Sequence, residues 1–300
     1  MSGRARTVLA AIVFACAGCT REAPRGAASS SSGAQALIDH GRFDEAIESI
    51  GTAADADSLY LLGRAWEGKG RSAPLPTPPP GSGVPAGTLF KPEEERALAF
   101  LERAVAARPD HIAALLAVAD LLAPHALART EAGRKGGVPA AASLPAGPDA
   151  SVERVLRAYG DAVEADPAGT AAAEAMIAFA TRAGRLAEAD AAFQELLRRR
   201  REDPDLLVRY GDFLVQARQT PEDALSPYAQ ALIWRPTDAA TQLKMADIHL
   251  QAVAALLARR EYLRAEARVK EARKFVVAPG SPQAARLKEL EQVLRDVRGR

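Results

Sequence analysis

A spacing pattern that recurs along this 300-residue chain constrains its fold more than any other feature. A small residue is followed by a bulky residue four positions later, a small residue seven later and a proline twelve later. Offsets of four and seven lie on one helix face, and proline ends a helix because it lacks an N–H and clashes with the preceding turn. The pattern therefore predicts repeated helices that pack through the same face. The copies are Ala97, Leu101, Ala104 and Pro109; Val155, Tyr159, Ala162 and Pro167; and Ala224, Tyr228, Ala231 and Pro236.

Weaker copies also occur along the chain, and one of them carries Ala189 and Phe193 at the first two positions. A partner helix is expected before each copy. Tyr210 and Gly211 form a bulky–small step in one partner helix, and a small residue lets two helices approach closely. The predicted repeating unit is therefore a helix, a turn and a second helix.

This unit resembles the tetratricopeptide repeat, a helix–turn–helix unit of about 34 residues. The resemblance covers roughly residues 34–280. It implies an all-α fold, a right-handed α-solenoid of about five to six helix pairs. Residues 281–300 carry a further apolar helical pattern, which resembles the cap helix that such arrays need at an open end.

Two stretches rich in proline and glycine interrupt the array, residues 68–92 and 123–150. This composition disfavours helix. Each stretch is expected to be a long loop between the two helices of one repeat, because a solenoid tolerates extra chain at that place.

The N-terminus reads as an export signal. Arg4 and Arg6 precede an apolar run that is too short to span a membrane, which is typical of a signal peptide over residues 1–18. Ala17 and Gly18 before Cys19 resemble the lipobox of bacterial lipoproteins, in which that cysteine is acylated. Cys16 is a weaker alternative site, and an ordinary signal peptide or an uncleaved anchor is the alternative class.

The lipoprotein resemblance implies lipidation at Cys19 and a location in the cell envelope. Residues 19–33 would form a flexible tether to the membrane. Thr20, rather than aspartate, follows the cysteine, and this resembles sorting to the outer membrane, facing the periplasm, in a cell that has one.

No pattern for catalysis is found, so we expect a binding protein rather than an enzyme. The four histidines have no metal-ligand spacing, the chain after residue 19 has no cysteine, and no Gly-x-Ser-x-Gly motif occurs. The net charge of +1 gives no overall basic field for nucleic acid. We expect no cofactor, no metal and no small-molecule substrate. The four arginines at 198–201 are interpreted as a solvated helix end.

Three partner helices share a small–Asp–apolar step that contains Asp120, Asp212 and Asp247. The family resemblance implies that these aspartates point into the concave groove, where they would favour a cationic protein or peptide partner. The alternative is three solvated side chains. The chain has no asparagine, so the asparagine-containing carboxylate clamp of chaperone-binding family members is excluded.

Two functions remain open. The first is an envelope-anchored scaffold or adaptor for protein–protein interaction. The second is an accessory lipoprotein in the assembly or secretion machinery of the outer membrane, pili or surface polymers.

Overall fold

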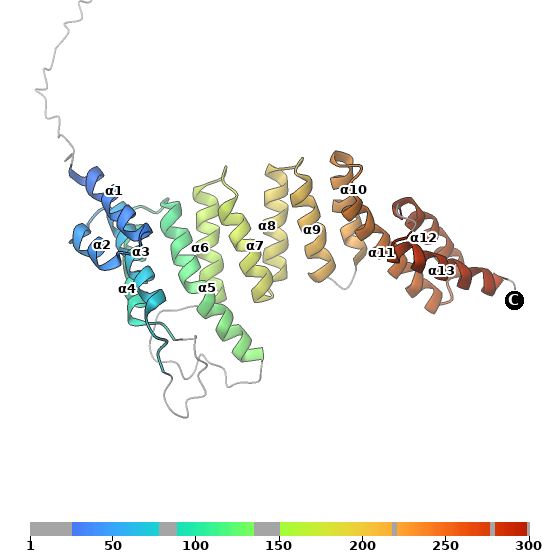
Figure 1. The fold of residues 1–300 in the computed structure, drawn as a ribbon, viewed down its shortest axis with the longest axis horizontal. Helices are drawn as coiled ribbons and strands as arrows, with labels where there is room; N and C mark the ends of the chain where they lie inside the picture. The colour runs from blue at the N-terminus through green and yellow to red at the C-terminus, as the bar shows by residue number, and fades with distance from the viewer. Residues whose placement is uncertain (1–25, 78–88, 135–150, 218–220, 277–279, 299–300) are drawn as a thin grey trace, which may run out of the picture. The chain divides into compact units, whose positions relative to one another are not determined.

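The computed structural model describes residues 26–77, 89–134, 151–217, 221–276 and 280–298, which are helical with no strand among them (Figure 1). The α-helices are α1 Gly26–Asp39, α2 Phe43–Ile50, α3 Ala56–Ser72, α4 Pro92–Ala107, α5 Ile112–Arg134, α6 Val152–Ala165, α7 Ala171–Ala183, α8 Leu186–Arg199, α9 Pro204–Ala217, α10 Leu225–Trp234, α11 Ala239–Ala258, α12 Tyr262–Phe275 and α13 Pro282–Arg298. A short 3₁₀ helix, η2 Pro221–Ala224, leads into α10.

The helices divide into two compact units. The first unit contains α1 to α4, with α1 packed on α2 and α3 packed on α4. The second unit contains α5 to α13 and has four pairs, α5 with α6, α7 with α8, α9 with α10, and α11 with α12. Within each unit every helix also packs on its neighbour along the chain. This is the packing of an α-solenoid, and the all-α fold class is confirmed.

The last helix, α13, packs on α11 and α12 of the second unit. Its buried residues include Leu287 and Leu294, which join a core with Val253 and Val269. The helix therefore covers apolar surface of the final pair, as a cap helix does.

The recurring positions of the sequence pattern form the core. Gly211 shows how closely the helices approach, because a Cβ at this position would lie 2.4 Å from the ring of Tyr228. Gly63 stands in the same relation to Leu101, at 2.6 Å. The residues predicted to pack the repeats are all buried, namely Ala97, Leu101, Ala104, Val155, Tyr159, Ala162, Ala189, Phe193, Gly211, Ala224, Tyr228 and Ala231.

Helix α5 differs from the loop expected at 123–150, because it continues through Pro124 to Arg134. A proline inside a helix costs about 3 kcal/mol. Its helix buries Leu122, Ala126 and Leu127, and burying each large aliphatic side chain contributes about 1.5–3 kcal/mol, which offsets that cost. Among the described residues α5 is also the one helix long and apolar enough to cross a membrane, but more than half of that stretch is buried in the fold. It is a core helix.

The insert expected at 68–92 is also shorter than its composition suggested, since α3 continues to Ser72. Within this part of α3 only glycine fits at position 68, because the ring of Phe43 would lie 2.2 Å from a Cβ there. At the other end, the buried Lys91 donates from Nζ to the carbonyl oxygens of Gly70 at 2.6 Å and Ala73 at 2.7 Å. Lys91 thus caps α3 and holds the two ends of the insert together.

The tether expected at 19–33 is helical from Gly26 onwards, where α1 begins. Helix formation fits the run of alanines and serines at 27–32, which contains neither proline nor glycine. The signal peptide at 1–18 and Cys19 lie outside the described residues, as does most of the second insert, 135–150.

Candidate functional site

The three aspartates predicted to line the groove each accept a hydrogen bond from within the chain. Asp120 accepts from the hydroxyl of Tyr159 at 2.7 Å. Asp212 accepts from the hydroxyl of Tyr228, also at 2.7 Å. Asp247 accepts from the amide of Gln283 of α13 at 3.1 Å. The structure does not bring the three carboxylates together as an open set of ligands.

Two of these bonds follow one rule of the repeat. In the pairs α5–α6 and α9–α10 the bulky position of the second helix is tyrosine, and an aspartate of the first helix receives its hydroxyl. In α7–α8 the bulky residue is Phe193, which has no hydroxyl, and Ala178 stands at the place of the aspartate. The role of the aspartate is therefore to accept the hydrogen bond of a buried tyrosine hydroxyl. The pKa values of Tyr159 and Tyr228 are both raised, mainly by burial and to a lesser extent by the hydrogen bond to the carboxylate.

The charge of Asp212 is also balanced by a cation. Lys244 of α11 donates from Nζ to both carboxylate oxygens of Asp212, each at 2.7 Å. The ammonium lies 5.8 Å from the ring centroid of Tyr228 as well. The hypothesis of a cationic partner relied on free carboxylates, and at Asp212 an internal lysine already occupies that role.

The four arginines at the end of α8 lie largely in local ion pairs. Arg198 and Arg199 both pair with Glu195 on the same helix. Arg200 pairs with Asp203 at 2.5 Å. These are contacts of a helix end with its own surroundings, as expected from the sequence.

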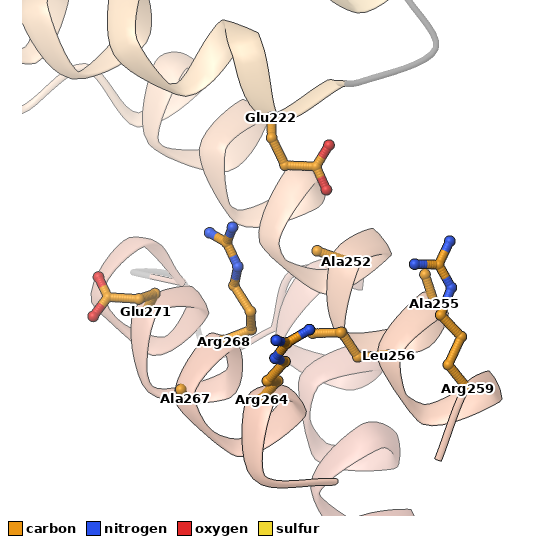
Figure 2. Close-up of a pocket in the computed structure, with 9 residues that line it drawn as sticks. All are labelled: Glu222, Ala252, Ala255, Leu256, Arg259, Arg264, Ala267, Arg268 and Glu271. Carbon is orange, nitrogen blue, oxygen red and sulfur yellow. The ribbon is translucent and has the colours of Figure 1, made fainter. Parts of the chain in front are cut away.

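A different arginine cluster lines a pocket of the second unit (Figure 2). The cavity has a volume of about 550 Å³ and lies between η2 and the facing sides of α11 and α12. Leu256 and three alanines give it an apolar floor. Its charged residues are Arg259, Arg264, Arg268, Glu222 and Glu271.

These charges are only partly balanced within the protein. Arg264 pairs with Glu261 at 2.7 Å. Glu271 accepts from Lys274, with 2.8 Å to each oxygen, and in Figure 2 its carboxylate points away from the other charged groups. In the part of the chain that the structure describes, Arg259 and Arg268 form no ion pair with a carboxylate. Two guanidinium groups thus remain as the unpaired cations of the pocket.

Arg268 is positioned by a buried histidine. Its Nη1 lies 3.3 Å from Nδ1 of His249, and a guanidinium can only donate, so Nδ1 accepts and a neutral His249 carries its proton on Nε2. Burial lowers the pKa of His249, and the charge of Arg268 lowers it further. The ring also stacks on Phe275, with centroids 5.7 Å apart. A neutral partner holds Arg268 in place without forming an ion pair with it.

The turn beside the pocket has an unusual residue. Gly41 and Gly184 take the left-handed conformation in the turns after α1 and α7, with φ of 74° and 78°. Arg260 stands at the same place after α11, with φ of 60°. In all three turns two successive N–H groups close the helix end, here onto the carbonyls of Leu257 at 3.0 Å and Leu256 at 2.9 Å. Glycine is the ordinary residue for this conformation, so arginine here carries a cost.

This pocket could not be predicted directly from the sequence. Its residues come from three segments, and the charges on each segment alone look like a solvated helix surface. One signal was available in the sequence. At the turn after α11, Arg260 stands where the turns after α1 and α7 have Gly41 and Gly184.

Comparison with known proteins gives similarity to solved structures only. No protein-family model matches the sequence, and no curated protein matches it. MamA from Desulfovibrio magneticus RS-1 is 15% identical over 71% of this chain and 98% of its own, with a TM-score of 0.43. A structure of MamA AMB-1 is 15% identical over 70% of this chain and 92% of its own, with a TM-score of 0.41. Human IFIT1 is 14% identical over 90% of this chain and 55% of its own, with a TM-score of 0.41.

Proposed function

We propose that this chain is a lipid-anchored helical-repeat protein of the cell envelope that binds a protein partner and acts as a scaffold or adaptor. The observation that carries the proposal is the pocket between η2, α11 and α12. Its walls come from two successive helix pairs, so it exists only because the pairs stack. Surfaces built in this way are how repeat arrays bind partners.

The anchor is supported by the sequence. A short apolar run after Arg4 and Arg6 ends at Ala17, Gly18 and Cys19. Two or three acyl chains on Cys19 would give stable attachment to a membrane, whereas one chain gives only marginal binding. Thr20 favours the outer membrane where the cell has one.

The anchor is tested with Cys19→Ala in the full chain, expressed in bacteria that process lipoproteins. The wild type should incorporate a labelled fatty acid and sediment with membranes. The variant should lose the label and either leave the membrane fraction or remain unprocessed. A variant that keeps both its label and its membrane location would place the acylation elsewhere.

Partner binding is tested by crosslinking in cells that make the protein. A photoreactive amino acid at Ala255, an exposed residue lining the pocket, should capture a defined protein. The same amino acid at Ala191, an exposed residue of α8 away from the pocket, is the control. The proposal requires a product at Ala255 that is absent at Ala191. Identical products at both positions, or none at either, would contradict it.

The identity of the crosslinked protein distinguishes a general adaptor from an accessory component of an assembly machine. A membrane barrel, a pilus subunit or a polymer exporter would favour the second reading.

A further inference from the structure

We infer that the pocket between η2, α11 and α12 binds an acidic segment of the protein partner, in which carboxylate side chains meet Arg259 and Arg268 and an apolar side chain lies on the floor. The inference rests on the proposed function, because it specifies the partner chemistry of that same pocket. It differs from the sequence-based expectation of a cationic partner, which depended on Asp120, Asp212 and Asp247. None of these three residues lines the pocket.

The first support is the imbalance of charge. Arg264 and Glu271 are paired with Glu261 and Lys274, which leaves Arg259 and Arg268 against Glu222 as the groups without an ion-pair partner in the described chain. The excess is positive. Carboxylates of a ligand could accept hydrogen bonds from these guanidinium groups, and such charge-assisted bonds are the stronger class of hydrogen bond.

The second support is the placement of the two arginines. Figure 2 shows Arg259 and Arg268 rising from different helices toward the segment that carries Glu222, with Leu256 between them at the floor. Arg268 is held by His249 at 3.3 Å, so its guanidinium is partly fixed before any ligand arrives. Fixing a side chain in advance lowers the entropy lost on binding.

The third support concerns the kind of anion. Leu256 and the alanines make the floor apolar, which suits an aliphatic side chain next to a carboxylate. Glu222 lines the pocket and would repel a dense polyanion such as a sulfated polysaccharide or a nucleic acid. A peptide segment that alternates acidic and apolar residues satisfies both features.

The inference predicts opposite effects for two substitutions. Arg259→Gln with Arg268→Gln should weaken binding of an acidic peptide by about tenfold, since each partly exposed ion pair contributes up to about 1 kcal/mol. Glu222→Gln should strengthen binding about two- to threefold, because it removes a negative charge from the pocket lining that repels an acidic ligand. Arg157→Gln with Arg286→Gln is the matched control, because it removes two exposed arginines from α6 and α13, outside the pocket.

The experiment uses the purified full chain and a fluorescent peptide of alternating glutamate and leucine, with fluorescence anisotropy at two salt concentrations. A peptide with glutamine in place of glutamate and a sulfated polysaccharide serve as comparison ligands. The expected result is binding of the glutamate peptide alone, weakened by salt and by the double arginine substitution, with the control variant unchanged. Thermal unfolding by circular dichroism verifies that the variants remain folded, and the gain with Glu222→Gln cannot arise from loss of folding.

Equal binding of the glutamine peptide, preference for the polysaccharide, or an unchanged affinity after the arginine substitutions would each overturn the inference. These outcomes leave the scaffold proposal intact if the crosslink at Ala255 persists. Conversely, absence of that crosslink defeats the scaffold proposal whatever the peptide does.

Discussion

Replacing Arg260 by glycine should stabilise the turn between α11 and α12, although the change removes a charged side chain. Arg260 has φ of 60°, in the region where the Cβ of an L-residue crowds the following carbonyl. That crowding costs about 1–2 kcal/mol. Glycine has no Cβ and avoids this cost. Glycine also has more conformational freedom in the unfolded chain, which lowers the stability of the folded protein by about 0.4–1 kcal/mol. The net expectation is a stabilisation of about 0.5–1 kcal/mol.

A neighbouring substitution provides the control. Arg259 has φ of −84°, which any residue adopts, so Arg259→Gly removes the same charge without relieving any crowding. It should destabilise the protein by about 0.4–1 kcal/mol. The two variants thus have the same net charge and opposite predicted signs. Gly184→Ala offers the reverse test in the turn after α7, where φ is 78° and a Cβ should cost about 1 kcal/mol.

Amide hydrogen exchange is the most direct assay, because repeat arrays open locally and a single melting temperature averages over the whole chain. Arg260→Gly should raise the protection of amides in α11 and α12 by about two- to fivefold. Thermal unfolding should shift upwards by about 1–4 °C. If Arg260→Gly proves no more stable than Arg259→Gly, the left-handed turn carries no strain and the reasoning fails.

Three further predictions concern single side chains. Tyr228→Phe should cost about 1 kcal/mol by removing the hydroxyl bond to Asp212, whereas Tyr228→Ala should cost about 3–5 kcal/mol, both measured by urea denaturation; a Tyr228→Phe variant as stable as the wild type would show that the hydroxyl contributes nothing. Lys91→Met should destabilise the protein by about 1–3 kcal/mol and speed hydrogen exchange at the end of α3, because the carbonyl oxygens of Gly70 and Ala73 lose the Lys91 ammonium as a donor; unchanged exchange would count against the cap. The lowered pKa of the buried His249 means that the unfolded chain takes up a proton there more readily than the folded chain. Stability should therefore be fully present above about pH 6.5 and fall as the pH drops toward the lowered value. In a series of urea denaturations from about pH 5 to 8, His249→Gln should reduce the fall in the free energy of unfolding at the acidic end. An equally steep fall in the variant would place the effect on another group.

The helix pairs could be predicted from the sequence because their signal is local. Tyr228 is buried against Gly211 for the reason that the repeating pattern suggested, since a bulky residue at a fixed place needs a small residue opposite. Local signals failed at Pro124. Its cost to the helix is visible in the sequence, but the compensating burial of Leu122 and Leu127 depends on the packed unit.

The site was harder to predict because its partners are distant in the chain. Asp120 looked like a groove carboxylate, yet its hydroxyl donor, Tyr159, lies 39 residues away. The co-occurrence of tyrosine and aspartate within one repeat was readable and would have pointed to this bond. The pocket arginines had no such rule, because their common surroundings arise only when η2, α11 and α12 pack together.

The contact of Lys91 with the end of α3 has a consequence for how this fold can change in length. Since the chain leaves near Ala73 and returns at Lys91 to the same spot, the first unit does not depend on how many residues lie between. Closing a longer flexible loop costs little, about 0.6 kcal/mol for each doubling. This position should therefore accept a whole inserted domain whose own ends lie close together, and it marks where the protein could acquire or lose a module while its helix pairs stay the same.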